Sequence, residues 1–482
     1  MTLFRHNILW ILVLIILTGC NFRAAVNPTS YAAPCYEGSW TPCKEDPIPD
    51  CLLMESADCD ECPDVGIDES LGLANLLDIA LRRSPLTRET WSYARLAAAQ
   101  YGVAQSPFYP DINFEAFWEA LRNPAFFGGP IVLIDEFREY GPYLTLSYLV
   151  WDFGTTRAIS TAFYQQLLEA NWNHNREIQT VVQTVTNDYY KLITQREKVT
   201  AGEANLNDAN TTLSATEAKH KFGISDITDV YTAQTMVAKE TMQLLSDEQG
   251  EVDALATLLA DVGLPANACL DIDNLAEKID EEEFLQTVDH YICLAYEARP
   301  DLRSAYAKVL SDESFLKAAR RHQLPRVTFD GHIGQSNFSN GSTDHYDYSA
   351  KFSFNYPLFK GWRYMNEIRE AQAMVEVSKA KLRDVEVQMV KEVVTSYQDF
   401  NYSTQIVVVN KEYVALAQKT YVANLSEYKS GTVDITTLVN AQTNLADARY
   451  SLAEARKNWY DALTNLTYAT GVVTKPCCPG GL

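Results

Sequence analysis

Two cysteines separated by two residues, Cys59 and Cys62, form the motif in this chain that most resembles a reactive site. Such a pair can bind a metal or undergo redox chemistry where nearby positive charge stabilises its thiolates. Here Asp60 and Glu61 lie between the two thiols, and negative charge disfavours thiolates. The histidines that could complete a site are scattered, and none has a metal-binding spacing; beyond the first twenty residues they are His174, His220, His290, His322, His332 and His345.

The other common signatures of catalysis, a nucleophile elbow and a phosphate-binding loop, do not occur in this sequence. We therefore expect no enzymatic activity, no bound metal and no catalytic cofactor. The formal net charge of −23 also argues against nucleic acid as a partner, because phosphate contacts need a basic surface. An acidic excess of this size is typical of a solvated exterior, or it lines a passage and favours cations.

The start of the chain is typical of an export signal. A short basic beginning precedes an apolar run from Ile8 to Leu17, which is too short to cross a bilayer core as a helix. The residues from Leu17 to Cys20 resemble the lipobox of bacterial lipoproteins, in which the cysteine is acylated. We predict a signal peptide at 1–19 and a lipid on Cys20. Asn21 follows in place of Asp, which favours the outer membrane as the destination.

The remaining cysteines favour disulfides, because an exported chain meets oxidising conditions. Residues 20–69 are acidic and rich in proline, and we interpret them as a tether with disulfide staples. Cys269 and Cys293 are a possible disulfide between the two repeats described next. An odd number of cysteines follows Cys20, so one is free or links to a neighbouring chain; they are Cys35, Cys43, Cys51, Cys59, Cys62, Cys269, Cys293, Cys477 and Cys478.

The sequence contains the same unit twice. Pro85 and Pro300 stand 215 residues apart, and Gly223 and Gly431 stand 208 residues apart. Many further markers keep nearly the same offset, which indicates a duplication. The boundaries that we predict are a first repeat at 70–265, a connection at 266–284, a second repeat at 285–473 and a cysteine-containing tail at 474–482.

Each repeat contains a pair of strands, indicated by alternating apolar and polar residues. The second repeat has the runs 327–333 and 346–356, and the first has the runs 112–120 and 144–150. Each pair stands alone in the sequence, and two strands make no stable sheet. Beyond the signal no apolar stretch is long enough for a membrane helix, so a crossing requires strands closed into a barrel. Four strands are too few to enclose water, which predicts a barrel shared between several chains.

Helices surround each strand pair. One helix precedes the pair, at Leu71–Gln105 and again at Leu285–Arg321. A much longer segment without proline follows it, at 155–222 and at 362–430, and each would reach roughly 100 Å as a helix. Apolar residues spaced by three and four indicate helix-on-helix packing in the first of these segments; they are Ile178, Val181, Val185, Tyr189 and Leu192.

Each long helix is expected to turn back at a glycine. Gly223 and Gly431 permit the positive φ that ends a helix, and a shorter returning helix follows each of them. Asp226 and Asp434 stand where they can cap the returning helices.

From Leu71 to Val473 this arrangement resembles the TolC-like outer membrane factor family, in its lipoprotein branch. The most specific residues run from Tyr428 to Ile435, followed by Asn440, Ala441, Gln442, Leu445, Ala448 and Arg449. The resemblance implies a mainly α fold with a membrane β-barrel. It implies a homotrimer in outer-membrane lipid, in which each protomer gives four strands to a twelve-strand barrel and its long helices to a periplasmic α-helical tunnel.

The resemblance also implies partners and a gate. A periplasmic adaptor, which recruits an inner-membrane pump, is expected to dock at the two helical turns, on Lys221, Gly223, Asp226, Lys429, Gly431 and Asp434. In the family, acidic residues just past the second turn can narrow the entrance. The corresponding Thr437 and Asn440 are uncharged here, so the acidic gate is either absent or moved to Asp229.

The expected function is therefore an exit duct of a tripartite efflux or secretion system, which passes substrates from the pump to the exterior. The alternative is a structural or adhesive envelope lipoprotein with the same architecture and no transport. Ion conductance of the purified protein distinguishes the two. The substrate, whether drug, metabolite, metal or protein, is selected by the pump and is not indicated by these motifs.

Overall fold

A computed structural model describes residues 71–126, 132–264, 286–338 and 345–472, with the separate positions 32, 37, 38, 40, 266, 272 and 273. The signal peptide, the lipobox and the tail predicted above lie outside these residues, as do all cysteines except Cys293. The chain forms two compact units. We call them the strand unit, which contains Arg95–Leu167 and Ser314–Ile368, and the helical unit, which contains Ala32–Ala94, Leu168–Glu313 and Arg369–Leu482.

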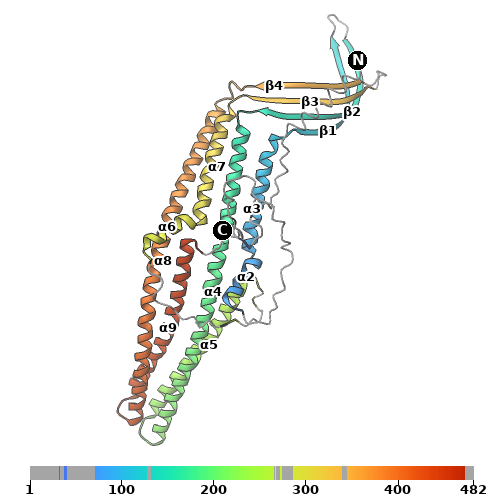
Figure 1. Ribbon diagram of the computed structural model, residues 1–482. Coiled ribbons are helices and arrows are strands. Elements are labelled where there is room, and N and C mark those ends of the chain that lie inside the picture. The colour runs from blue at the N-terminus through green and yellow to red at the C-terminus, as the bar shows by residue number, and fades with distance from the viewer. Residues whose placement is uncertain are drawn as a thin grey trace. The chain divides into compact units, whose positions relative to one another are not determined.

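The secondary structure follows the same order twice along the chain (Figure 1). The first half contains α2 (Leu73–Arg83), α3 (Pro85–Gln105), the short 3₁₀ helix η3 (Ser106–Phe108), β1 (Asp111–Phe126), β2 (Val132–Trp151), α4 (Thr155–Lys221) and α5 (Ile227–Val262). The second half contains α6 (Val288–Ala298), α7 (Pro300–His322), β3 (Arg326–Phe338), β4 (His345–Asn355), α8 (Arg363–Ser430) and α9 (Ile435–Thr470). The predicted fold class, mainly helical with a small strand region in a duplicated chain, is confirmed.

The helix before each strand pair is broken, and the prediction of one continuous helix was wrong. In the first half α2 ends before Ser84 and α3 begins at Pro85, and in the second half Arg299 separates α6 from Pro300. Proline has no backbone N–H and its ring forces the preceding residue out of the helical conformation. Ser84 and Arg299 accordingly have extended backbones, with ψ of 125° and 122°.

The long helices α4 and α8 have 67 and 68 residues and turn back into α5 and α9. The five apolar residues that predicted packing along α4 are all buried, which confirms that this face contacts other helices. Most charged residues of these helices stay partly or fully exposed. Within the described residues, no helix combines the length and the apolar character that a membrane crossing needs.

The four strands form one antiparallel sheet in the order β1-β2-β3-β4. The prediction that each strand pair stands alone was wrong, because β2 pairs with β3 and joins the two hairpins. Leu144 lies opposite Ile333, and Tyr148 lies opposite Phe329. The apolar alternation of the two hairpins continues across this junction, so that joining them buries no polar side chain among apolar ones.

The sheet has one apolar face and one polar face, as the alternation predicted. Partners in an antiparallel register point to the same side, so the pairings define each face. The apolar face carries Ile112, Phe114, Leu144, Leu146, Tyr148, Phe329, Ile333, Tyr348, Phe352 and Phe354. Several of these aromatic side chains are highly exposed in the single chain; Tyr348 is 74% exposed and Phe352 is 73% exposed.

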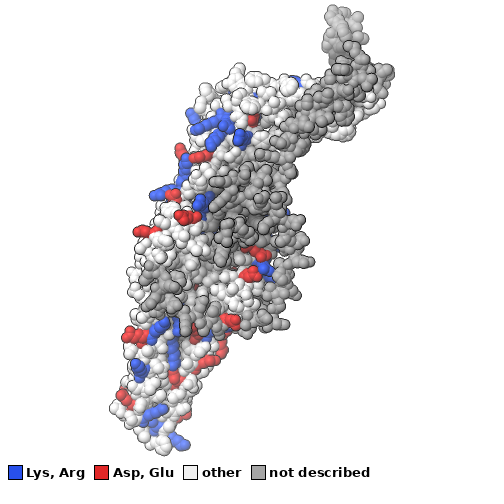
Figure 2. All heavy atoms as spheres, in the orientation of Figure 1, with Lys and Arg blue, Asp and Glu red and all other residues white. Residues whose placement is uncertain are grey.

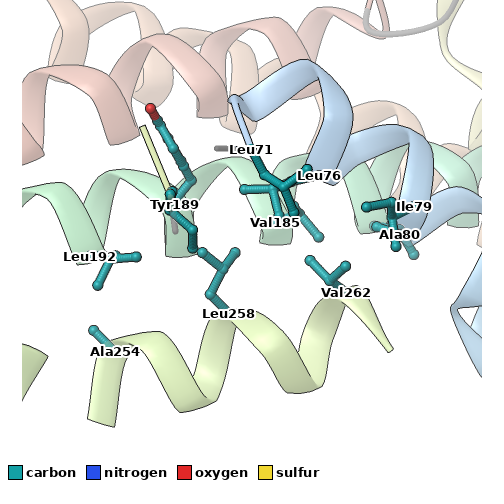
Figure 3. Close-up of a cluster of buried hydrophobic side chains, with 12 residues drawn as sticks. Leu71, Leu76, Ile79, Ala80, Val185, Tyr189, Leu192, Ala254, Leu258 and Val262 are labelled. Atoms are coloured by element: carbon teal, nitrogen blue, oxygen red, sulfur yellow. The ribbon is translucent and has the colours of Figure 1, made fainter. Parts of the chain in front are cut away.

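The helical unit holds the main core, where α2, α4 and α5 meet (Figure 3). Figure 3 shows Val185 of α4 beside Leu76 of α2, with Leu258 of α5 pointing toward α4 from the other side. Leu71 also pairs with Ile272 in a short parallel bridge, which ties the connection between the repeats to the start of the first one. Burial of these side chains stabilises each by roughly 1.5–3 kcal/mol, and it holds the long helices in register.

Candidate functional sites: the helical tips and the strand sheet

The long helices turn back through one backbone motif, used twice. At the first tip, defined as residues 219–231, Gly223 N donates to His220 O at 2.9 Å and Ile224 N donates to Lys219 O at 2.9 Å. At the second tip, residues 427–439, Thr432 N donates to Glu427 O at 2.9 Å in the same way. This pattern ends a helix at a residue with positive φ, which glycine adopts without strain. The six residues expected at the tips are exposed: Lys221, Gly223, Asp226, Lys429, Gly431 and Asp434.

The two aspartates that precede the returning helices behave differently. Asp434 Oδ1 accepts from Thr437 N at 2.7 Å, and the hydrogen bonds of Thr437 hold the pKa of this carboxyl below its usual value. Asp226 occupies the same position at the start of α5, but its side chain makes no capping hydrogen bond. The expectation that it would cap was wrong in this respect. The amide of Asp229 bonds to the backbone carbonyl of Asp226 at 3.2 Å instead.

The tips also differ in how much apolar surface they expose. Ile227 of the first tip is 45% exposed, whereas Ile435, its counterpart in the second repeat, is 7% exposed. Phe222 and Ile224 add further exposed apolar surface to the first tip only, at 77% and 67%. The second tip instead packs its apolar residues into a cluster that includes Tyr428 and Ile435. Adjacent apolar side chains on a surface mark an interaction site more often than scattered ones do.

The second tip is fastened to α4. Lys219 Nζ donates to the carbonyl oxygen of Tyr428 at 2.8 Å and lies 4.0 Å from the centre of its ring. The Tyr428 hydroxyl donates to Thr216 Oγ1 at 3.2 Å. These contacts explain why the apolar side of the second tip is covered, since α4 lies over it. The first tip has no such cover in the described part of the chain.

The predicted gate residues lie in the first turns of the two returning helices. Asp229 is half-buried in the first turn of α5, and Thr437 and Asn440 are exposed on α9. Burial raises the pKa of the Tyr428 hydroxyl, and the Asp229 carboxylate raises it further. The Asp229 carboxylate of the first tip therefore interacts electrostatically with Tyr428 of the second tip, whereas Thr437 and Asn440 are uncharged.

Arg449 of α9 links three helices, a role that sequence reasoning missed. Its guanidinium donates to Asn205 Oδ1 at 2.6 Å, to Asp208 Oδ2 at 2.9 Å and to Gln418 Oε1 at 3.1 Å. Asn205 and Asp208 belong to α4, and Gln418 belongs to α8. Bonds to charged groups are stronger than neutral ones, so this contact holds the helices in one arrangement. Arg449 stood out in the sequence only as part of the family's characteristic residues.

The polar face of the sheet carries more acidic than basic side chains. His332 lies on this face, where its Nε2 is 3.2 Å from Asp347 Oδ2 and its Nδ1 is 2.8 Å from Ser349 Oγ. The carboxylates that share this face by register are Asp111, Glu115, Glu119, Glu139, Asp330 and Asp347, and the cations on it are Arg326 and Lys351. A water-filled passage along this face would favour cations.

Of the residues considered above for metal or thiol chemistry, the described part of the chain contains the six histidines and a single cysteine, Cys293. There, no group of three or more His, Cys, Asp or Glu side chains could hold a metal ion. Cys293 is exposed on α6. Its predicted partner, Cys269, lies outside the described residues, so this disulfide stays a prediction.

Comparison with known proteins identifies this architecture. The family model for outer membrane efflux proteins matches residues 76–264 and 292–472. Protein CyaE of Bordetella pertussis is 24% identical over 387 residues, which are 79% of this chain and 80% of CyaE. The pyoverdine export outer membrane protein OpmQ of Pseudomonas aeruginosa is 22% identical over 414 residues, 83% of this chain and 85% of OpmQ. The solved outer-membrane channel OprN has the same fold, with a TM-score of 0.76, 16% identity and coverage of 83% of this chain and 89% of OprN.

These matches confirm the resemblance that the repeated tips and strand pairs indicated. They span both repeats, so they cover the tips and the sheet together. They place the protein in the outer membrane and give it the function of an exit duct in efflux or secretion. The chain belongs to the outer membrane efflux protein family.

Proposed function

We propose that three copies of this chain form a duct that a lipid on Cys20 anchors to the outer membrane. Substrates enter at the helical tips, where a periplasmic adaptor connects the duct to an inner-membrane pump, and they leave through a barrel shared by the three copies. The duct performs no bond chemistry. The observation that carries this proposal is a sheet with one apolar face and one polar face, in which each outer strand has one edge that pairs with no strand among the described residues.

The outer strands of the sheet support a shared barrel. Among the described residues β1 and β4 each pair with a strand on one side only. An unpaired edge within a membrane leaves backbone groups without hydrogen bonds, which costs several kcal/mol for each group. Pairing β4 of one copy with β1 of the next satisfies both edges, and three copies close a ring of twelve strands with its apolar face toward lipid.

Exposed apolar stripes on the helices support the same assembly. On α8 the exposed residues Tyr402, Ile406, Val409, Tyr413 and Leu416 alternate spacings of four and three. On α5 the exposed residues Tyr231, Ala238, Leu245 and Val252 recur every seven residues. Both are the repeats by which one helix packs against another in a coiled coil. Neither stripe is covered by the described residues of one chain, so a neighbouring copy is the natural partner of each.

The first tip is the stronger candidate for adaptor contact, because its apolar residues are exposed. Ile224→Asp is expected to weaken adaptor binding by at least roughly tenfold, since it replaces an apolar contact worth about 1.5–3 kcal/mol with a charge. The measurement is the amount of adaptor recovered with the full-length protein from chemically crosslinked cell envelopes, identified by mass spectrometry.

Thr432→Asp is the matched control, because Thr432 occupies the position of Ile224 in the second tip and is also exposed. It adds the same charge without removing an apolar side chain, so a much smaller loss is expected. Both variants should conduct ions like the wild type in planar bilayers. Equal recovery of the adaptor with both variants would place the adaptor contact elsewhere.

Asp229 is the residue by which we test the gate. Asp229→Asn is expected to raise about fivefold the concentration of divalent cation that blocks conductance, because a nearby unit charge contributes about 1 kcal/mol in water. Single-channel recording with cation on the tip side measures this. Asp226→Asn is the control, since Asp226 lies in the same turn and its carboxylate accepts no capping bond. An unchanged blocking concentration in Asp229→Asn would remove Asp229 from the gate.

A further inference from the structure

A pocket of about 570 Å³ lies in the strand unit, where the first strand pair passes into its long helix. Its wall comes from the end of β2, the first turns of α4, the last turns of α7 and the short helix η3. Its volume falls within the range of roughly 300–1,000 Å³ that is common for small-molecule sites. The tips do not contribute to it, and of the polar face of the sheet only the apolar Leu149 lines it, so the duct as described makes no use of this pocket.

Three cationic side chains line the pocket: Arg157 of α4, and Lys317 and Arg321 of α7. Arg321 Nη1 donates to the carbonyl oxygen of Gly154 at 3.0 Å, which holds its guanidinium at the wall. Arg157 and Lys317 are exposed, and neither makes an ion pair with a carboxylate in the described part of the chain. The pocket therefore presents two cations that are available to a ligand.

The carboxylate at the pocket, Asp152, is already engaged. Its Oδ1 accepts from Gly154 N at 2.9 Å and its Oδ2 accepts from Thr156 N at 2.6 Å. These bonds cap the start of α4 and direct both oxygens to the backbone. One negative charge against three positive ones leaves the pocket net cationic, although the whole chain carries a net charge of −23. Figure 2 also shows Lys and Arg side chains gathered near the ends of the helices at the sheet.

The pocket continues into the apolar face of the sheet. Tyr148, which lies opposite Phe329 on that face, forms part of its wall. Trp151 would point to the polar face in a regular strand, but an irregularity between Leu149 and Trp151 places it opposite Val327, on the apolar face. Irregularities of this kind re-aim a side chain. Trp151 is 59% exposed, and it gives the cationic pocket an aromatic rim toward the apolar face.

The matching turn of the second repeat also exposes large apolar and aromatic side chains. Leu358, Phe359 and Trp362 follow β4 and are among the most exposed apolar side chains of the strand unit. Aromatic side chains gather at the level where a membrane meets water, because their rings accept both environments. Both strand-to-helix turns therefore lie at the level of lipid headgroups, given the membrane placement of the sheet in the proposed function.

We propose that this pocket binds the phosphate of an anionic phospholipid, with the acyl chains lying along the apolar face of the sheet. Arg157 and Lys317 contact the phosphate, Arg321 shapes the wall, and Trp151 lies beside the glycerol region. The continuity of a cationic pocket with an apolar membrane face favours a lipid over a free anion. Basic pockets beside membrane-embedded segments bind lipid headgroups in this manner.

The test measures lipid binding to the purified full-length protein by native mass spectrometry. Short-chain phosphatidylglycerol is the probe, and phosphatidylcholine is the neutral comparison. One phosphatidylglycerol per protomer is expected for the wild type. The double variant Arg157→Gln/Lys317→Gln is expected to bind it roughly thirtyfold more weakly, because each cation near a lipid surface contributes about 1 kcal/mol.

Lys391→Gln/Lys419→Gln is the matched control, since it removes two exposed cations of α8 that are remote from the pocket in sequence and do not line it. It should bind phosphatidylglycerol like the wild type. Equal binding by the pocket variant and the wild type, or saturable phosphatidylcholine binding of equal strength, would overturn the proposal. Displacement of the lipid by millimolar inorganic phosphate would assign the pocket to a free anion and overturn the lipid assignment.

The proposal rests on the membrane placement of the sheet, so the two are tested separately. Trimer formation and ion conductance in phosphatidylcholine bilayers report on the duct without anionic lipid. The pocket variant is expected to form conducting trimers. A wild type that neither conducts nor forms trimers contradicts the proposed duct, whereas a conducting wild type without selective phosphatidylglycerol binding contradicts only the pocket.

Discussion

Arg299→Ala is expected to lower the free energy of unfolding of the helical unit by about 3 kcal/mol. Only 3% of the Arg299 side chain is exposed. Its Nε donates to Asp301 Oδ1 at 3.0 Å, and its Nη1 donates to Glu392 Oε2 at 2.6 Å and to the carbonyl oxygen of Ala469 at 3.2 Å. The arginine thereby links the start of α7 to α8 and α9. Its removal leaves a cavity and deprives two carboxylates and a buried carbonyl of their donor.

The loss is expected at the lower end of the range for broken buried ion pairs, because the Glu392 side chain is 46% exposed and keeps contact with water. Thermal unfolding of the detergent-purified protein, followed by far-ultraviolet circular dichroism, measures the effect. Arg383→Ala is the control, since Arg383 also pairs with a glutamate but its side chain is 73% exposed. Exposed pairs contribute about 0–1 kcal/mol, so equal destabilisation by both variants would contradict the argument.

The same contact predicts how stability depends on pH. Burial alone would raise the pKa of Asp301, but its hydrogen bond with Arg299 and the charge of Arg176 hold it below the usual 3.8. A lowered pKa in the folded state stabilises the protein above the unfolded pKa, and this stabilisation is lost as the pH falls through the folded value. The difference between wild type and Arg299→Ala should therefore shrink in acid. A difference that grows as the pH falls would contradict this assignment.

Gly141→Val is expected to prevent assembly of a conducting duct. Gly141 is buried in β2, and a Cβ atom there would lie 1.7 Å from the backbone oxygen of Gln335 on β3. Backbone atoms cannot move aside without breaking the β2–β3 pairing, which is the junction between the two hairpins. Overpacking lowers the free energy of unfolding by about 1–3 kcal/mol where side chains can adjust. A clash with the backbone is expected to cost at least the upper value of this range. The yield of conducting trimer should fall at least roughly tenfold.

Trimer on native gels and conductance per unit of protein in planar bilayers measure this yield. Gly331→Ala is the control in the same sheet, because a Cβ atom at Gly331 would meet its nearest neighbours at 3.6 Å, an ordinary contact distance. It should assemble and conduct like the wild type. Normal conductance of Gly141→Val would show that the two hairpins need not be joined, and the shared barrel would then need another explanation.

Much of this protein follows from local patterns in its sequence. The alternation from Tyr346 to Tyr356 specified a strand with one apolar face, and the stripe that includes Val185 and Tyr189 specified a helix that packs on its neighbours. Gly223 and Gly431 specified where the long helices turn. The breaks at Pro85 and Pro300 were missed by the prediction of one continuous helix, although the signal is local, because proline acts on its own residue and the one before it. These features depend on a few adjacent residues, so the sequence displays them directly.

Other features depended on which distant segments meet. The pairing of β2 with β3 joins residues from opposite halves of the chain, and neither hairpin alone indicates it. Arg299 is buried because α8 and α9 approach it. Its sequence context, next to Pro300, gives no sign of this burial. The two tips have similar sequences. The contact of Lys219 with Tyr428 nevertheless covers the second tip, whereas the apolar residues of the first tip stay exposed. Sequence alone determined the repeated elements and their faces; the tertiary structure decided burial and partners, because both arise from contacts between segments far apart in the chain.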